Sequence, residues 1–310
     1  VLFLQPVFQE RLWGGTNLTQ FGYDIPNNST GECWAISAHK NGPNTILNGK
    51  HKGKSLKQVW DEDKALFGND SRKDFPLLTK ILDAHDRLSV QVHPDDEYAL
   101  KHEGEYGKTE CWYILDAQPG AEIIYGVNAT SKNELEHMID HHQFDYLFKH
   151  VPVKPGDFFY VPSGTMHAIG SGILILETQQ SSDTTYRVYD FDRKDDAGNL
   201  RELHLEKSID VLNIGEPANS RPVNLQVDNL SSTLLVANDF FAVYKWELTG
   251  QADFTKTADY TLNSVLNGQG QLTVDGQVYP IHKGDHFILP SDVASWKLEG
   301  HELELIVSHP

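Results

Sequence analysis

The chain of 310 residues carries 26 Lys and Arg against 44 Asp and Glu, so its formal net charge is −18. Nucleic acid and anionic membrane repel such a protein, and we expect neither as a partner. Without a ~20-residue apolar span or a signal peptide, the expected location is cytoplasmic. Two cysteines are too few for a disulfide framework or a Cys-based zinc site. Against this acidity, a phosphorylated substrate would need a local cluster of Lys and Arg.

The N-terminal third contains a turn, a helix and a strand with an unusual lysine. Trp13-Gly14-Gly15 suits a tight turn with an aromatic side chain over a ligand, but plain packing of this segment is the favoured alternative. Residues 55–67 predict a helix, because their apolar positions have helical spacing after Ser55 as a cap. Residues 75–94 predict two strands joined by a polar turn. Lys80 lies within the first, and burying a charge is costly, so we expect Lys80 to have a functional role.

Residues 87–112 combine several polar side chains with a change from strand to helix and back. Gln91 and His93 alternate with valines in SVQVHP, which places both on one face of a strand. PDDEYALKHE predicts a short helix. Glu110 then begins an apolar strand, and residues 110–127 predict a β-hairpin around Pro119-Gly120.

A helical insertion is predicted at about 130–150. Ser131 and Glu134 have the spacing of a capping box, and Leu135 and Ile139 lie on one helical face. His141 and His142 are adjacent and do not face each other on a helix, which favours a solvated polar surface over a metal site.

An internal repeat links the middle of the chain to its C-terminus. An offset of 128 residues aligns Gly156 with Gly284 and Pro162 with Pro290 without a gap, but it aligns His167 with Ser295. The second copy also has no counterpart of Gln91, His93 and Glu110. We therefore expect one copy to bind metal and the other to lack a site.

The fold predicted from many short strands with Gly and Pro turns is mainly β, with two cupin (jelly-roll) barrels and a small helical insertion. Residues 1–225 are assigned to a catalytic metal-binding domain that includes the helical segments near 55–67 and 130–150. Residues 226–310 are assigned to a metal-free cupin domain that follows a polar linker.

The metal candidates come from three predicted strands. His93, Glu110 and His167 provide two imidazoles and one carboxylate, and Gln91 can add a neutral oxygen. Such a set, with a position left for water or substrate, suits catalytic Zn²⁺ or the facial triad of an Fe²⁺ enzyme. Spacing alone does not choose between the two metals.

Several segments resemble one family when they are taken together. SVQVHPDD, GKTECWYIL, PGDFFYVPSGTMHAIG and TYRVYDFDR are similar to type I phosphomannose isomerases, in their compact bacterial form within the cupin superfamily. RLWGG and PLLTKIL extend the likeness over nearly the whole chain.

The resemblance implies a function and residue roles. The implied reaction is the interconversion of mannose 6-phosphate and fructose 6-phosphate, with one zinc ion per chain. His93, Glu110 and His167 match the family's zinc ligands, and Gln91 matches the position of a fourth. Arg187 matches an active-site arginine, and Lys108 and Lys80 match lysines that line the pocket.

The residue types fit aldose–ketose isomerisation through an enediol. A dication polarises the carbonyl group, and Lys108 is a candidate base if burial and the metal lower its pKa. The donor fork of Arg187 suits a phosphate or an enediolate oxygen, and Lys80 and Ser89 can complete an anion cluster. Trp13 is a further candidate substrate contact.

Two alternatives remain open at this point. One is a cupin Fe(II) oxygenase on the same triad, and the other is a sugar-phosphate-binding cupin without catalysis. The sequence makes no prediction of an oligomeric state.

Overall fold

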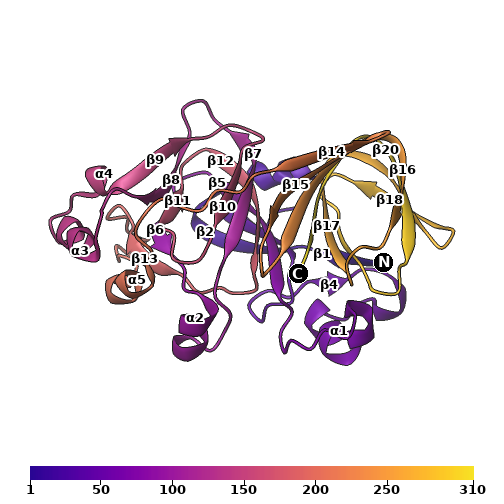
Figure 1. Cartoon of the computed structure of the whole chain (residues 1–310), viewed down its shortest axis with the longest axis horizontal. Coiled ribbons are helices and arrows are strands. Elements are labelled where there is room, and N and C mark those ends of the chain that lie inside the picture. Colours follow the sequence, from indigo (N-terminus) through magenta and orange to yellow (C-terminus); the bar gives the residue numbers. More distant parts are fainter.

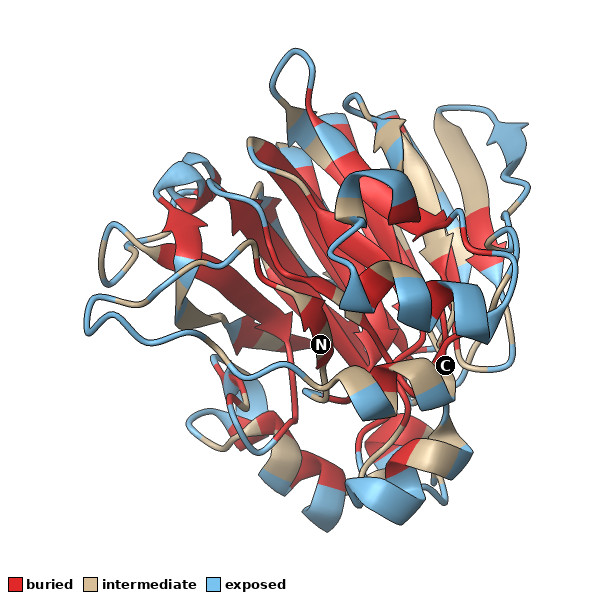
Figure 2. Cartoon of the chain, turned by 90° about the vertical axis from the view of Figure 1, so that its left-hand side faces the viewer, coloured by how far each residue is buried: buried red, intermediate tan, exposed pale blue.

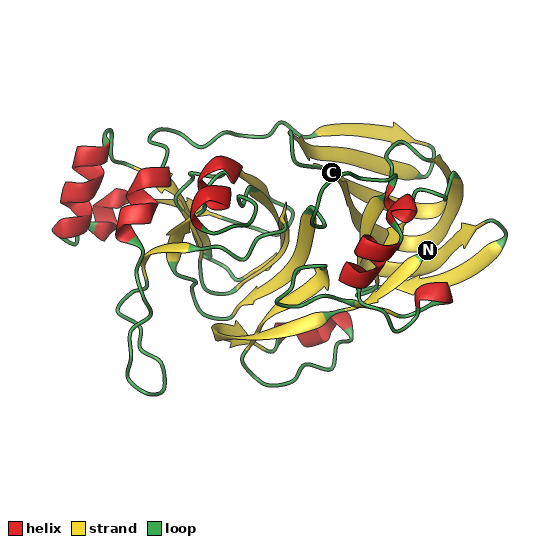
Figure 3. Ribbon diagram, turned by 90° about the horizontal axis from the view of Figure 1, so that it is seen from below, coloured by secondary structure: helices red, strands yellow, loops and turns green.

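The computed structural model describes all residues from 1 to 310. It confirms the mainly β class: two bodies of strands lie side by side, and the helices lie around their periphery (Figures 1 and 3). None of the helices is long and apolar enough to cross a bilayer.

The N-terminal body is built from two facing sheets. The first has the order β10-β7-β12-β5-β3-β2 and consists of β2 (Val7–Gly15), β3 (Thr30–Ile36), β5 (Leu77–Ala84), β7 (Glu110–Ala117), β10 (Phe158–Val161) and β12 (Ile173–Gln180). The second has the order β13-β6-β11-β8-β9 and consists of β6 (Val90–Val92), β8 (Glu122–Val127), β9 (Phe148–Pro152), β11 (His167–Ile169) and β13 (Tyr186–Tyr189). Leu82 and Ile175 of the first sheet share one apolar cluster with Ile123 and Ile169 of the second, so the sheets pack face to face.

The hairpin predicted for residues 110–127 is wrong. β7 and β8 are strands with a short turn between them, but they belong to different sheets. The turn at Pro119-Gly120 carries the chain across the edge of the sandwich, so that apolar side chains of both strands enter the same core. A turn signal in the sequence does not distinguish these two outcomes.

The C-terminal body is one strongly curved sheet. Its nine strands follow the order β14-β15-β16-β20-β17-β19-β1-β4, with β18 paired to β17: β1 (Leu2–Gln5), β4 (Thr45–Ile46), β14 (Val223–Val227), β15 (Leu230–Ala237), β16 (Ala242–Thr255), β17 (Thr261–Val274), β18 (Gln277–His282), β19 (His286–Leu289) and β20 (Ser295–His309). β1 and β4 come from the region assigned to the catalytic domain. The domain boundary at residue 225 stays a prediction, and strands from both sides of it belong to this curved sheet.

The internal repeat is visible in the strands. The offset of 128 residues places β10 on β19 end to end, and it places His167 at the start of β11 on Ser295 at the start of β20. Asp275 and Gly276 both have positive φ, 48° and 78°, and they form the hairpin turn between β17 and β18.

The helices begin largely where the sequence predicts. They are the 3₁₀ helices η1 (Asn17–Phe21), η2 (Gly49–His51) and η3 (Lys64–Phe67), and the α-helices α1 (Leu56–Glu62), α2 (Asp96–His102), α3 (Lys132–Asp140), α4 (Phe144–Leu147) and α5 (Leu205–Val211). Ser55 and Gln58 make a reciprocal capping box on α1. On α3 the Ser131 hydroxyl accepts from the Glu134 backbone, but the Glu134 side chain turns to Thr130 instead of completing the predicted box.

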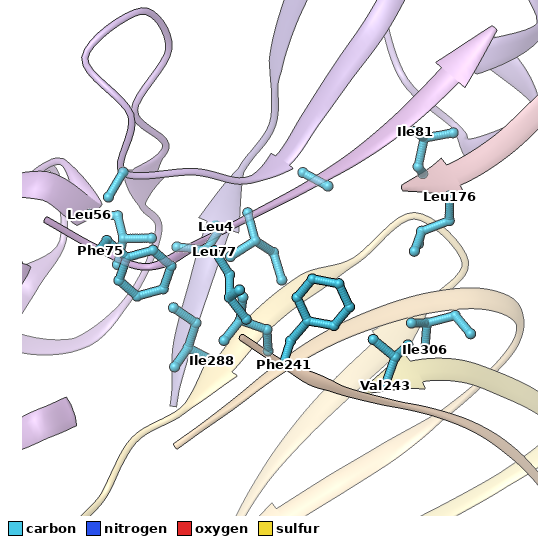
Figure 4. Packing of buried hydrophobic residues seen from close by; sticks show 14 of the residues in the cluster. Leu4, Leu56, Phe75, Leu77, Ile81, Leu176, Phe241, Val243, Ile288 and Ile306 are labelled. Atoms are coloured by element: carbon cyan, nitrogen blue, oxygen red, sulfur yellow. The ribbon is translucent and has the colours of Figure 1, made fainter. Parts of the chain in front are cut away.

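The largest apolar cluster joins the two bodies. Phe75, Leu77 and Leu176 meet Leu4, Phe241, Val243, Ile288 and Ile306 across the junction (Figure 4). Buried residues run along the strands, whereas the outer helices present exposed faces (Figure 2). This shared core fixes the six-stranded sheet, which carries half of the site described below.

Candidate metal centre and its cavity

One row of side chains crosses the five-stranded sheet. In the antiparallel register, Gln91 on β6 lies directly opposite His167 on β11 and Arg187 on β13. His93 follows β6 after one residue, because the strand ends before Pro94. The sheet therefore brings together three residues that are separated by as many as 96 positions in the sequence.

His93, Glu110 and His167 converge on one point. Their candidate ligand atoms all lie within 4.8 Å of one another, and all three residues are buried. Nε2 of His93 is 3.5 Å from Oε2 of Glu110, and Nε2 of His167 is 3.3 Å from Oε1. Gln91 reaches the same place, with its side-chain amide nitrogen 3.5 Å from Nε2 of His167. Two imidazoles, a carboxylate and an adjacent amide are a donor set for a divalent transition metal.

The electrostatics of the three residues fit a metal ion. Burial and the charge of Lys108 lower the pKa of His93 well below its ordinary value, and burial lowers the pKa of His167 to about 4. Both rings are therefore neutral near pH 7. Nδ1 of His167 faces the Thr165 carbonyl at 2.8 Å, which leaves Nε2 as the free lone pair. Oε2 of Glu110 is buried and accepts no hydrogen bond, as an oxygen reserved for a metal would be.

Lys108 lies beside this triad but is not a lysine with a depressed pKa. Its ammonium nitrogen is 3.4 Å from Oε2 of Glu110 and 3.3 Å from Nε2 of His93. Burial lowers the pKa of Lys108, but the nearby carboxylates of Glu110 and Glu177 outweigh burial and raise it. The sequence-based expectation considered burial and the metal but not these two carboxylates.

The six-stranded sheet contributes a second buried charged group. Lys80 lies opposite Glu177 in the register, 3.7 Å from its carboxylate and 3.9 Å from that of Glu32. Trp112 donates to both Glu110 and Glu177, at 3.1 and 3.0 Å. Burial and the charge of Glu110 raise the pKa of Glu177 to about 7. The lysine predicted to be functional therefore lies in a network of buried carboxylates.

A cavity of about 430 Å³ opens onto both groups. Only 5 of its 17 lining residues are hydrophobic, so it suits a polar, charged ligand. The lining includes the following predicted site residues: Trp13, Lys80, Ser89, Gln91, Lys108, Glu110 and Arg187. Ser89 is buried and faces Nε of Arg187 at 3.3 Å. The structure thus brings all the predicted site residues to one place, with His93 and His167 behind Glu110 and Gln91.

Five charged residues of the cavity were not predicted as site residues: Arg11, Glu32, Glu177, Asp183 and Arg201. Glu177 interrupts the apolar strand ILILETQQ, and the cost of burial used for Lys80 would have identified it too. Arg11 and Glu32 pair with each other at 3.1 Å. Arg201 lies in a charged loop, and no sequence pattern distinguishes it from its neighbours.

Family models match both ends of the chain. Residues 1–119 match the model described as phosphomannose isomerase type I, catalytic domain. Residues 231–310 match the model described as mannose-6-phosphate isomerase, cupin domain.

Full-length relatives agree with these matches. The chain is 59% identical to a mannose-6-phosphate isomerase of Streptococcus mutans, over 99% of this chain and 98% of the relative. It is 55% identical to the mannose-6-phosphate isomerase ManA of Bacillus subtilis, with the same coverage. A crystal structure of the mannose 6-phosphate isomerase from Bacillus subtilis superposes with a TM-score of 0.97 at 47% identity, and covers 100% of this chain and 99% of that one.

Proposed function

Because the chain belongs to the type I phosphomannose isomerases, we propose that it interconverts mannose 6-phosphate and fructose 6-phosphate. The observation that carries this proposal is the position of the buried triad of His93, Glu110 and His167 beside a charged cavity with Arg187 in its wall. A sugar phosphate needs both features, since its carbonyl end reacts while its phosphate end is held.

We propose Zn²⁺ as the metal, with one ion per chain held by His93, Glu110 and His167. Gln91 is the proposed fourth ligand, and exchange of its amide oxygen and nitrogen would turn the oxygen toward His167. When bound, zinc supplies a Lewis acid that polarises a carbonyl oxygen. Neutral imidazoles and the free oxygen of Glu110 support this assignment.

Proton transfer between C1 and C2 is assigned to Lys108 and Glu177. Isomerisation requires a group that removes a proton from one carbon and a donor near the oxygen that gains one. Lys108 lies within 3.5 Å of two triad residues and carries a proton at neutral pH, so we assign it as the proton donor to oxygen. Glu177 faces the same cavity, and its pKa of about 7 suits the exchange of a carbon-bound proton.

The remaining lining residues are assigned to substrate binding. Arg187 offers a planar donor fork, and Ser89 lies at its Nε. Lys80 lies between two carboxylates, so we assign it to sugar hydroxyls and not to the phosphate. Residues 13–15 lie within β2, so the expectation of a tight turn there is wrong. Trp13 is almost completely buried within the apolar cluster of the sandwich and forms a wall of the cavity.

The test is a coupled assay that reports fructose 6-phosphate formed from mannose 6-phosphate by the zinc-loaded protein. We expect turnover in both directions, with saturation in each substrate. Absence of turnover by fully metallated protein would reject the proposal. Oxygen consumption with Fe²⁺ and a neutral substrate would instead favour the oxygenase alternative.

A further inference from the structure

Two arginines bind one buried carboxylate beside the cavity, and a third arginine lies nearby. Asp190 follows β13, and its side chain is only 6% exposed. Arg201 donates to it from Nε at 2.8 Å and from one terminal nitrogen at 2.6 Å, and Arg193 donates to it at 2.7 Å. Arg193 also lies 3.5 Å from exposed Asp86. Arg187 lies close enough for the charge of Arg201 to act on it, since burial and that charge lower the pKa of Arg187.

Asp190 holds together the loop of residues 190–204, which runs from the end of β13 to the start of α5 and carries Arg201. The loop returns to β13 at Arg187, whose backbone N–H donates to His204 Nδ1 at 3.0 Å and whose carbonyl accepts from the His204 N–H at 2.7 Å. One terminal nitrogen of Arg187 donates to the Glu202 carbonyl at 2.9 Å. Asp190 joins the two arms by binding Arg193 on one and Arg201 on the other. Arg201 therefore has a fixed position although its loop is exposed.

Arg187 and Arg201, which both line the cavity, each keep a free donor. Asp190 occupies Nε and NH2 of Arg201, and NH1 makes no hydrogen bond. Ser89 and Glu202 occupy Nε and NH1 of Arg187, and NH2 makes none. Both side chains line the same cavity, so two guanidinium groups offer donors to one ligand.

The other cations of the cavity are paired. Arg11 lies 3.1 Å from Glu32, Lys80 lies 3.7 Å from Glu177, and Lys108 lies 3.4 Å from Glu110. Arg187 forms no ion pair, and Arg193 and Arg201 share the carboxylate of Asp190, so excess positive charge remains at this part of the cavity. This matters because the protein as a whole is strongly acidic, and a doubly charged anion binds where local charge compensates the global repulsion.

We propose that Arg201 is a phosphate-binding residue that acts together with Arg187, and that Asp190 is the positioning residue that holds Arg201 in place. The proposal rests on the function proposed above and assigns the phosphate end of the substrate. It also places the phosphate at the part of the cavity wall that β13 and the loop after it form.

The test compares Arg201→Ala, Arg201→Lys and Asp190→Asn with Lys194→Ala. Lys194 lies on the same loop, is exposed and does not line the cavity, so its variant removes one loop charge without touching the site. We expect Arg201→Ala to raise the KM for mannose 6-phosphate and the inhibition constant of inorganic phosphate about 10- to 100-fold, as loss of a charged hydrogen bond does. The kcat should stay within about 3-fold if Arg201 acts on binding alone.

Asp190→Asn should give a smaller rise in the same two constants, and Arg201→Lys an intermediate one, while Lys194→Ala leaves both unchanged. A fall in kcat with unchanged phosphate inhibition would overturn the proposal, as would equal effects from Lys194→Ala. Calorimetric titration of inorganic phosphate into each variant separates this proposal from the function above, because it measures phosphate binding even if the wild-type protein shows no turnover. Arg201→Lys keeps the assay informative if the other two variants do not fold.

Discussion

At the scale of residues, the site is a set of charges that compensate one another inside the fold. Lys80 is 3% exposed, and Glu177 and Glu32 are 3% and 8% exposed. A buried charge persists when it is paired, and removal of one partner leaves the other without compensation. Lys80 therefore has a structural consequence in addition to its place in the cavity wall.

Replacement of Lys80 by Met should destabilise the protein by about 3 kcal/mol, because two buried carboxylates lose their cation. Urea unfolding measures this loss, with a chelator present for every variant so that metal binding does not contribute. Adding Glu177→Gln to Lys80→Met should restore part of it. The exposed Lys154→Met is the matched control and should change stability by less than about 0.5 kcal/mol. A double variant less stable than Lys80→Met would contradict this account of the pair.

The residues proposed as metal ligands could be chosen from the sequence, whereas the acid beside them was not predicted. Gln91, His93 and Glu110 lie within one short segment, and His167 lies in a recurring β-motif, so pattern and resemblance identified all four. Glu177 occurs alone in an apolar strand. Its raised pKa depends on Glu110, a neighbour that only the pairing of β12 with β7 reveals. The carboxylates of Glu110 and Glu177 also raise the pKa of Lys108, whereas the sequence-based expectation was a lowered pKa.

At the scale of elements, a single side chain joins the segment after α2 to the segment before β13. One carboxylate oxygen of Glu105 accepts from the Ser182 hydroxyl, the Asp183 N–H and the Thr184 hydroxyl at 3.0, 3.1 and 2.6 Å, and His39 lies 3.3 Å from the other oxygen. Burial alone would raise its pKa, but these donors lower the pKa of Glu105 to about 2. The link holds Asp183 and Thr185 in the cavity wall.

This link predicts a dependence of stability on pH. The folded pKa of about 2 lies below the ordinary value of 4.5, so ionised Glu105 stabilises the fold above pH 4.5, and this stabilisation is lost as pH falls toward 2. At pH 7, Glu105→Gln should lower the unfolding free energy by roughly 1–3 kcal/mol. The difference from wild type should shrink as pH falls, when followed by urea unfolding at several pH values. A constant difference from pH 7 to pH 3 would contradict the prediction.

Elements were easier to predict from the sequence than the way they pair. Ser55 begins α1 as expected, and residues 130–150 contain α3 and α4. The pairing of β7 and β8 was predicted wrongly, because apolar strands on either side of a tight turn suit both a hairpin and a crossing between facing sheets. The packing of the sandwich core decides between them, and its partners are distant in the sequence.

At the scale of the whole molecule, the two bodies share a core, and two strands from the N-terminal part of the sequence belong to the C-terminal sheet. β1 pairs with β19, and β4 pairs with β1, so the N-terminal residues close the C-terminal sheet. The sequence did not predict that β1 and β4 join the C-terminal sheet, because the repeat and the polar linker both suggest separate barrels. Phe241 is 1% exposed within the shared cluster.

Truncation of Phe241 should test how far the bodies depend on each other. We expect Phe241→Ala to cost about 3–5 kcal/mol, because a cavity forms in the shared core. The sandwich and the curved sheet should then unfold together in one calorimetric transition at a lower temperature. The matched control is Tyr146→Ala, since Tyr146 is 76% exposed and its loss should matter little. Two separate transitions in the Phe241 variant would show that the bodies are energetically independent.

The central claim is that isomerisation depends on a metal held by His93, Glu110 and His167. Its most direct test measures mannose 6-phosphate turnover and metal content on the same sample before chelation, after chelation and after addition of Zn²⁺, for the wild type and for Glu110→Gln. We predict that chelation abolishes wild-type turnover, that one zinc ion per chain restores it, and that Glu110→Gln retains at least ten-fold less metal and recovers little activity. Full turnover by metal-free wild-type protein would contradict the claim.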